Sequence, residues 1–208
     1  MEVDQVNVVG LGGSLAAPSR SLAALRAALA GARESGAETE LLDLRELRLP
    51  LYVPTESAVP AGARRLLDTA GASDAMVWSS PLYQGTVSGA FKNALDWLHL
   101  LRDREPAFLS DQVIGLVATA GGVHGLQAVN TMEFSVRALR AFAVPLVVTV
   151  GPADKAFDAE GNLTDASVRE SLETLGREVA RIAGRFHESD TLESECAKAA
   201  ARLALAAA

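Results

Sequence analysis

Hydroxyl side chains and one arginine follow a short apolar run near the N-terminus. In GLGGSLAAPSRS, residues 10–21, a glycine turn leads to Ser14, Ser19, Arg20 and Ser21, where the pattern becomes helical. The start of a helix offers free backbone N–H groups and a favourable dipole to an anion, and the hydroxyls add further donors. We therefore predict a phosphate site here. The simpler alternative is that Ser19 or Ser21 only caps the helix, which needs a single hydroxyl.

Three other loop chemistries do not fit this stretch. A dinucleotide fingerprint, G-x-G-x-x-G, would need glycine where the chain has Leu15, and a Walker A loop would need a G-K-[ST] sequence that does not follow. The segment GGSLA, residues 12–16, lacks the last glycine of the G-x-S-x-G nucleophile elbow. Anion binding by hydroxyls and backbone N–H groups remains as the chemistry of this loop.

Two later loops carry an aromatic residue and bare glycines. SSPLYQGTVSG, residues 79–89, contains Tyr83, which is either a wall for a flat ligand or an ordinary aromatic packed at the rim. TAGGVHG, residues 119–125, exposes backbone on which a flat ring can lie, because glycine permits close approach. We interpret His124 in this loop as a solvated histidine rather than a ligand contact.

Short apolar runs alternate with amphipathic stretches along the chain. Strands are predicted at residues 6–9, 39–43, 75–79, 113–119 and 145–150, and several of them are apolar on both faces. The most regular helical spacing covers residues 168–186, and residues 44–62, with three prolines, are predicted as a long loop. The alternation predicts an α/β fold with a doubly wound parallel sheet, whose ligands bind beyond the carboxyl ends of the strands. The three loops described above follow the first, third and fourth strands.

Composition excludes several classes of protein. A net charge of −7 and a pI near 5.0 do not suit a chain that neutralises nucleic-acid phosphates, so no nucleic-acid partner is expected. The first residues are acidic where a signal peptide is basic, and no apolar run reaches about 18 residues, so we expect a cytoplasmic protein without membrane association. The single cysteine, Cys196, provides no ligand set, so no metal site is expected.

The three loops together, in this order and at these separations, resemble the NAD(P)H-dependent FMN reductase family of flavodoxin-like proteins. The resemblance covers residues 5–186, and its most specific part is P-x-Y followed by S-G-x-x-K-N-x-L-D-W, residues 81–97. The segment FDAEGNLTDASVRESLETL, residues 157–175, is also similar to the last loop and helix of that family. The resemblance implies a three-layer α/β/α flavodoxin-like fold with a five-stranded parallel sheet in residues 1–189, followed by an Ala-rich helical tail in residues 190–208.

The resemblance also implies which residues contact FMN. They are Ser14, Ser19, Arg20 and Ser21 at the phosphate, Pro81, Leu82, Tyr83, Gln84 and Gly85 beside the isoalloxazine ring, and Thr119, Gly121 and Gly122 at its pyrimidine side. The inserted segment Ala16-Ala17-Pro18 leaves open which hydroxyls reach the phosphate. No side chain is given a catalytic role, because a flavin carries the redox chemistry itself.

We therefore predict an enzyme that takes hydride from NADPH or NADH and passes electrons to a flavin, a quinone or a similar small acceptor in a ping-pong cycle. The resemblance implies a homodimer or homotetramer with the helix that bears Lys92 and Asn93 at the contact. Trp78 and Trp97 are either apolar anchors of that contact or core residues. Two other functions stay open: a flavodoxin-type electron carrier, and a non-catalytic module that binds a phosphorylated ligand.

Overall fold

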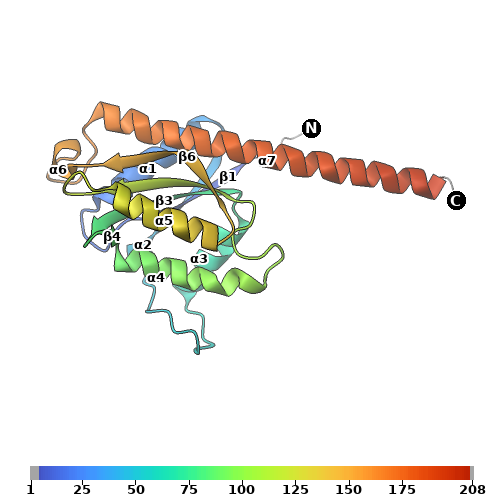
Figure 1. Ribbon diagram of the computed structural model, residues 1–208, viewed down its shortest axis with the longest axis horizontal. Coiled ribbons are helices and arrows are strands. Elements are labelled where there is room, and N and C mark those ends of the chain that lie inside the picture. Colours follow the sequence, from blue (N-terminus) through green and yellow to red (C-terminus); the bar gives the residue numbers. More distant parts are fainter. Residues whose placement is uncertain (1–4, 207–208) are drawn as a thin grey trace.

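A parallel sheet forms the centre of the molecule (Figure 1). The computed structural model describes residues 5–206, with side chains described as far as Phe186. The strands are β1 (Asn7–Gly12), β2 (Glu38–Asp43), β3 (Ala75–Tyr83), β4 (Thr86–Val87), β5 (Val113–Thr119) and β6 (Phe142–Val150). Five strands are parallel in the order β2-β1-β3-β5-β6, and β4 pairs antiparallel with the end of β3. The predicted five-stranded flavodoxin-like fold is confirmed, because this strand order, with its reversal between β1 and β3, is the flavodoxin order.

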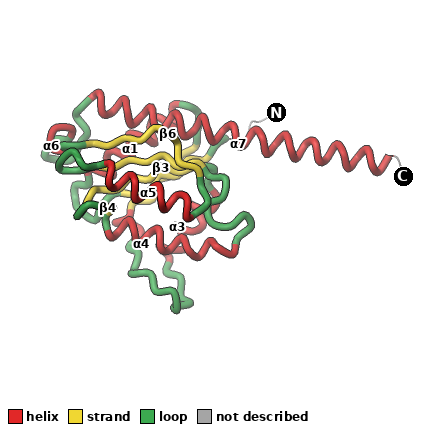
Figure 2. Tube along the Cα trace, viewed as in Figure 1, coloured by secondary structure: helices red, strands yellow, loops and turns green. Residues whose placement is uncertain are grey.

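Helices cover both faces of the sheet (Figure 2). One face carries α1 (Arg20–Glu34), α6 (Ala153–Ala156) and α7 (Ala166–Ala206), and the other carries α2 (Leu44–Leu47), α3 (Ala61–Ala72), α4 (Gly89–Trp97), the 3-10 helix η1 (Leu98–Asp103) and α5 (Leu126–Ala138). Neighbouring strand residues enter opposite cores: Val8 packs on the α1 and α7 side and Val9 on the α3 to α5 side. Apolar residues on both faces of each strand are what a covered parallel sheet requires.

Two of the three strands next to these loops run farther than predicted. β1 extends to Gly12, which pairs with Ser79, and β3 extends to Tyr83, with Pro81 opposite Thr119 of β5. Part of two predicted loops is therefore ordered strand. This places the loop residues on the rigid end of the sheet.

Two glycines let α1 and α7 cross in close contact on one face. A Cβ atom on Gly31 would overlap the carbonyl oxygen of Glu173, and one on Gly176 would overlap that of Ala28. Any larger residue at either position would force the helices apart. This crossing fixes α1, whose first turn borders the predicted phosphate site.

The last helix contains the predicted helical segment and continues well beyond it. α7 is a single helix of 41 residues, about 60 Å at 1.5 Å per residue, and it extends away from the sheet in Figure 1. The proposed division into residues 1–189 and 190–208 stays a prediction, and the side chains of His187 and Cys196 lie outside the described part. Within residues 5–206, no helix combines the length and apolarity needed to cross a membrane.

The predicted long loop begins with the short helix α2, and only residues 48–60 are irregular between α2 and α3. Asn93 of α4 accepts a hydrogen bond from the Tyr52 N–H (2.9 Å) and donates one to the Pro50 carbonyl (2.9 Å). The Trp97 indole N–H donates to the same carbonyl (2.9 Å).

Trp78 and Trp97 are 0% and 4% exposed, so the core interpretation of both is confirmed.

Candidate functional site

A cavity of about 410 Å³ lies beyond the carboxyl ends of β1, β3 and β5, where the strand order reverses. We call it the carboxyl-end cavity. Most predicted site residues line it: Ser14, Arg20, Ser21, Pro81, Leu82, Tyr83, Thr119 and Gly121. Ala16, Pro18, Ala120, Ala153 and Ala159 complete its walls. Four predicted residues are not among those that line it, namely Ser19, Gln84, Gly85 and Gly122.

Ser19 organises the first loop from behind the cavity. Its hydroxyl oxygen accepts hydrogen bonds from the Ser14 N–H (3.1 Å) and from the Leu22 N–H (3.3 Å), which makes Ser19 the N-cap of α1. The same hydroxyl contacts the Ser14 hydroxyl (3.2 Å) and the Ser21 hydroxyl (3.3 Å). The capping alternative is therefore confirmed for Ser19, while Ser14 and Ser21 lie at the cavity wall.

The strand next to β1 holds this loop in place. The Gly13 N–H donates to the Ser79 carbonyl (3.1 Å), and the Ser79 hydroxyl donates to the Ser21 carbonyl (2.8 Å). A Cβ atom on Gly12 would overlap the Ser79 carbonyl oxygen, so only glycine allows the two strands to approach here. The hydroxyls of Ser14 and Ser21, on residues 5% and 1% exposed, are thus fixed before any ligand arrives.

A short hairpin forms the second wall. β3 and β4 pair through Leu82 with Val87 and Tyr83 with Thr86, and the connecting residues Gln84 and Gly85 both have positive φ (48° and 83°). This geometry is that of a two-residue hairpin turn, for which glycine at the second position is favoured. Gln84 and Gly85, at the tip of this turn, are not among the residues that line the cavity. Tyr83, which is 50% exposed, presents its ring at the rim.

The loop after β5 forms a third wall made of backbone. Thr119 is buried at the end of the strand, and the Ala120 N–H donates to the Val150 carbonyl (2.9 Å). A Cβ atom on Gly121 or on Gly122 would meet no neighbouring atom within 4 Å, so both are open backbone. His124 is exposed, as expected of a solvated histidine.

Sequence reasoning missed the wall formed by α6 and the loop that follows it. Ala153 and Ala159 line the cavity, and Gly161 of the same loop lies so close to Pro18 that a Cβ atom would contact the proline ring at 2.7 Å. The Asp158 carboxylate closes this loop by accepting from the Asn162 N–H (2.7 Å) and side-chain amide (3.0 Å). These hydrogen bonds lower the pKa of Asp158 below its ordinary value. The only sequence signal was the similarity of residues 157–175 to a family loop.

The carboxyl-end cavity is lined by positive charge without negative charge. Arg20 is the one charged residue among those that line it, and none of them is Asp, Glu, His, Lys or Cys. Within the described part of the chain, the Arg20 guanidinium makes no hydrogen bond or ion pair. The cavity therefore offers donors to an anion, and its only titratable side chains are those of Arg20 and Tyr83.

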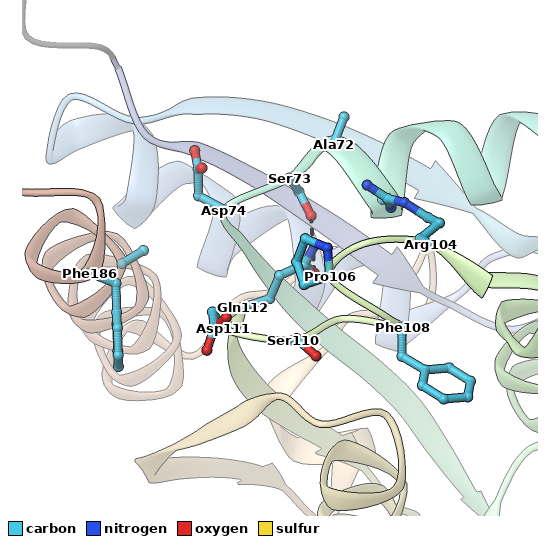
Figure 3. A pocket seen from close by; sticks show the side chains of 12 residues that line it. Ala72, Ser73, Asp74, Arg104, Pro106, Phe108, Ser110, Asp111, Gln112 and Phe186 are labelled. Carbon is cyan, nitrogen blue, oxygen red and sulfur yellow. Dashed lines mark hydrogen bonds between the residues drawn. The ribbon is translucent and has the colours of Figure 1, made fainter. Parts of the chain in front are cut away.

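A second cavity, of about 280 Å³, opens at the opposite end of the strands (Figure 3). We call it the amino-end cavity. Asp74, Asp111 and Arg104 line it, together with Ser73, Gln112 and others. Its buried polar groups are already paired, since Ser73 donates to Gln112 (3.4 Å) and both side chains donate to the Ala70 carbonyl. Two carboxylates line it beside a single arginine, so it does not fit the predicted phosphate.

Comparisons with known proteins give a family match and several curated relatives. The sequence model of a family described as NADPH-dependent FMN reductase matches residues 6–155. The chain is 32% identical to an NAD(P)H-dependent FMN reductase of Pseudomonas aeruginosa, over 87% of this chain and 99% of the relative. It is 31% identical to an NADPH:quinone oxidoreductase of Arabidopsis thaliana, over 82% and 88% of the two chains.

The fold is also similar to that of a solved oxidoreductase from Corynebacterium diphtheriae. The TM-score is 0.66 at 20% identity, and the match covers 86% of this chain and 97% of the other. The family match spans all three loops that follow β1, β3 and β5, although it ends before Ala159.

Proposed function

Because this chain belongs to the NADPH-dependent FMN reductase family, we propose that the carboxyl-end cavity holds the FMN and that a flat electron acceptor uses the same opening. The chain is an FMN-dependent NAD(P)H oxidoreductase. The observation that carries the proposal is the unpaired Arg20 beside two buried hydroxyls in a cavity without carboxylates.

The residues of the first loop fit the phosphate of FMN. A phosphate is a dianion that needs several donors, and Ser14, Ser21, Arg20 and the first-turn N–H groups of α1 supply them. Ser19 positions the two hydroxyls without lining the cavity itself. A volume of about 410 Å³ also lies within the range of cofactor sites.

The other two walls fit a planar ring. Pro81, Leu82 and Tyr83 offer an apolar side, and Thr119 with Gly121 offers polar backbone on the other. When bound, FMN supplies the hydride acceptance and electron transfer. The chain's part is to bind and orient the ring and to exclude water with the Ala153 and Ala159 wall.

The acceptor proposed is a quinone, an azo compound or a free flavin. Relatives of this chain are named NADPH:quinone oxidoreductase and NADPH azoreductase. The half-exposed Tyr83 leaves the rim open to a flat molecule, which supports one opening used in turn by NAD(P)H and by the acceptor. We propose on this basis a ping-pong cycle.

Absorbance and turnover measurements test this proposal. Purified protein titrated with FMN should show a bound flavin spectrum, and both NADPH oxidation and benzoquinone reduction should follow with parallel double-reciprocal lines. Absence of flavin binding would leave only a phospho-ligand module. Flavin binding without turnover would leave an electron carrier, and intersecting lines would overturn the ping-pong cycle.

A homodimer or homotetramer and a cytoplasmic location remain parts of this proposal. Large apolar side chains on α5, Leu126 and Phe134, are 55% and 74% exposed, which supports self-association. Light scattering after size-exclusion chromatography tests the assembly, and a monomer at all concentrations would overturn it. Cell fractionation tests the location.

A further inference from the structure

A third cavity, of about 440 Å³, lies on the other side of the loop that borders the carboxyl-end cavity. Its lining consists of Leu15, Leu44, Arg45, Arg48, Leu49, Leu51, Gly89, Ala90 and Asn93. Leu15 stands between Ser14 and Ala16, which face the carboxyl-end cavity. One loop therefore borders both cavities.

The apolar wall of this third cavity is exposed and yet held in place. Leu15 and Leu51 are 64% and 79% exposed, which is unusual for two large apolar residues beside one cavity. The segment around Leu51 is fixed by hydrogen bonds. Asn93 and Trp97 both donate to the Pro50 carbonyl, and Asn93 accepts from the Tyr52 N–H. Such a surface suits a flat aromatic group.

Two arginines provide positive charge at the same cavity. Arg48 makes no ion pair or hydrogen bond within the described part of the chain. Arg45 has only a long contact, 4.0 Å, to the carboxylate of Asp43, which is buried and also accepts from the Arg45 N–H (2.9 Å). Both guanidinium groups are exposed, and no carboxylate is among the lining residues. The charged side chains that line this cavity are therefore all positive, with Asp43 and Glu46 outside the lining.

We infer that this third cavity binds the adenosine end of NADPH, with Arg45 and Arg48 holding the 2′-phosphate and thereby selecting NADPH over NADH. The inference rests on the proposed function, since it completes the electron-donor site. Guanidinium groups bind phosphate in a bidentate manner, which suits a 2′-phosphate. NADH carries a hydroxyl at this position, so it leaves both arginines without a partner. The adenine would lie on the leucine wall.

Steady-state kinetics of Arg48→Gln test the inference. The change removes the charge and, because Arg48 has no partner in the described chain, it removes no stabilising contact. Loss of a charge-assisted hydrogen bond should raise KM for NADPH about 10- to 100-fold and leave KM for NADH and kcat unchanged. Arg48→Lys should recover part of the NADPH affinity. Arg64→Gln on α3, an exposed arginine outside the cavity, is the matched control and should change neither value.

Calorimetry gives a readout that needs no turnover. FMN-loaded protein is titrated with adenosine 2′,5′-bisphosphate and with adenosine 5′-monophosphate, so that the flavin blocks the other phosphate site. Wild type should bind the bisphosphate more tightly, and Arg48→Gln should abolish the difference. Equal affinity of wild type for the two nucleotides, or equal rises in KM for NADPH and NADH, would overturn the inference. Failure to bind FMN or to oxidise NADH would instead overturn the proposed function.

Discussion

The two ends of the same sheet carry cavities of opposite character. At the carboxyl ends, Arg20 has no partner in the described chain, and the hydroxyls of Ser14 and Ser21 face a cavity without carboxylates. At the amino ends, Ser73 and Gln112 use their donors on the Ala70 carbonyl, near the last turn of α3. The direction in which the helices connect successive strands explains this contrast.

In a βαβ unit each helix begins at the carboxyl end of a strand and ends at the amino end of the next. Helix starts leave free N–H groups, and helix ends leave free carbonyl groups. The amino-end cavity satisfies its carbonyl with buried side chains, whereas the carboxyl-end cavity keeps donors for a ligand. The comparison teaches that a cavity alone does not mark an anion site: Arg20 is the one charged residue that lines the carboxyl-end cavity, whereas Arg104 shares the amino-end cavity with Asp74 and Asp111.

The largest expected effect is loss of FMN from the carboxyl-end cavity. Ser14→Ala combined with Arg20→Ala removes two interactions with the phosphate at about 1.5–3 kcal/mol each, so FMN affinity should fall about 10²- to 10⁴-fold. Purified protein should lose its yellow colour. The control, Arg104→Ala with Ser110→Ala at the amino-end cavity, should keep FMN; equal loss in both would contradict the comparison.

Ser19 separates capping from anion binding. Ser19→Ala should lower stability by about 1 kcal/mol through loss of the cap. Ser19→Asp restores a capping oxygen but places a negative charge behind the phosphate site, so stability should return while FMN affinity falls at least about tenfold. Thermal melts and FMN titrations measure the two properties. FMN affinity that follows stability in both variants would show that Ser19 acts through the fold alone.

At the amino end, a change should affect stability without affecting FMN. Gln112→Ala leaves the Ala70 carbonyl and the Ser73 hydroxyl less well satisfied and should cost about 1–3 kcal/mol in urea unfolding. FMN affinity of the folded protein should not change. Asp111→Asn, at an exposed neighbour, is the control and should leave stability unchanged. A weakened FMN affinity in Gln112→Ala would mean that the two ends are coupled.

The smallest effect is expected at the loop that covers Pro18. Hydrogen bonds from Asn162 lower the pKa of Asp158 below 3.8, so its carboxylate supports the loop above that pH and loses this role only as the pH falls through the lowered pKa. Asp158→Asn should weaken FMN less than about threefold, as is usual for exposed charged groups. The difference from wild type should be constant between about pH 4.5 and pH 7. A difference that disappears by pH 4.5 would contradict the lowered pKa.

Much of the fold and part of the site could be predicted from local patterns. Apolar runs marked all five parallel strands. Because chain direction alone brings the loops after β1, β3 and β5 to one edge, Ser14, Arg20 and Ser21 line one cavity with residues of the other two loops. Strand ends were placed too early in β1 and β3, since Gly12 and Pro81 disfavour strands in isolation and pair only because neighbours approach them.

The roles that failed prediction depend on distant contacts. Ala153 and Ala159 carry no chemistry of their own, so only their packing beside Pro18 makes them a wall. Arg45 and Arg48 line a cavity only because Leu15 of the first loop and residues of α4 enclose it with them.

The sequence by itself determined the layered fold and the family, since both depend on residue type and on spacing along the chain, and it predicted the anion chemistry proposed for the first loop. The tertiary structure alone decided which hydroxyls face the cavity, which one lies behind it, and which arginines remain unpaired. Burial and pairing are properties of surfaces that meet across the sheet, and no local pattern contains them.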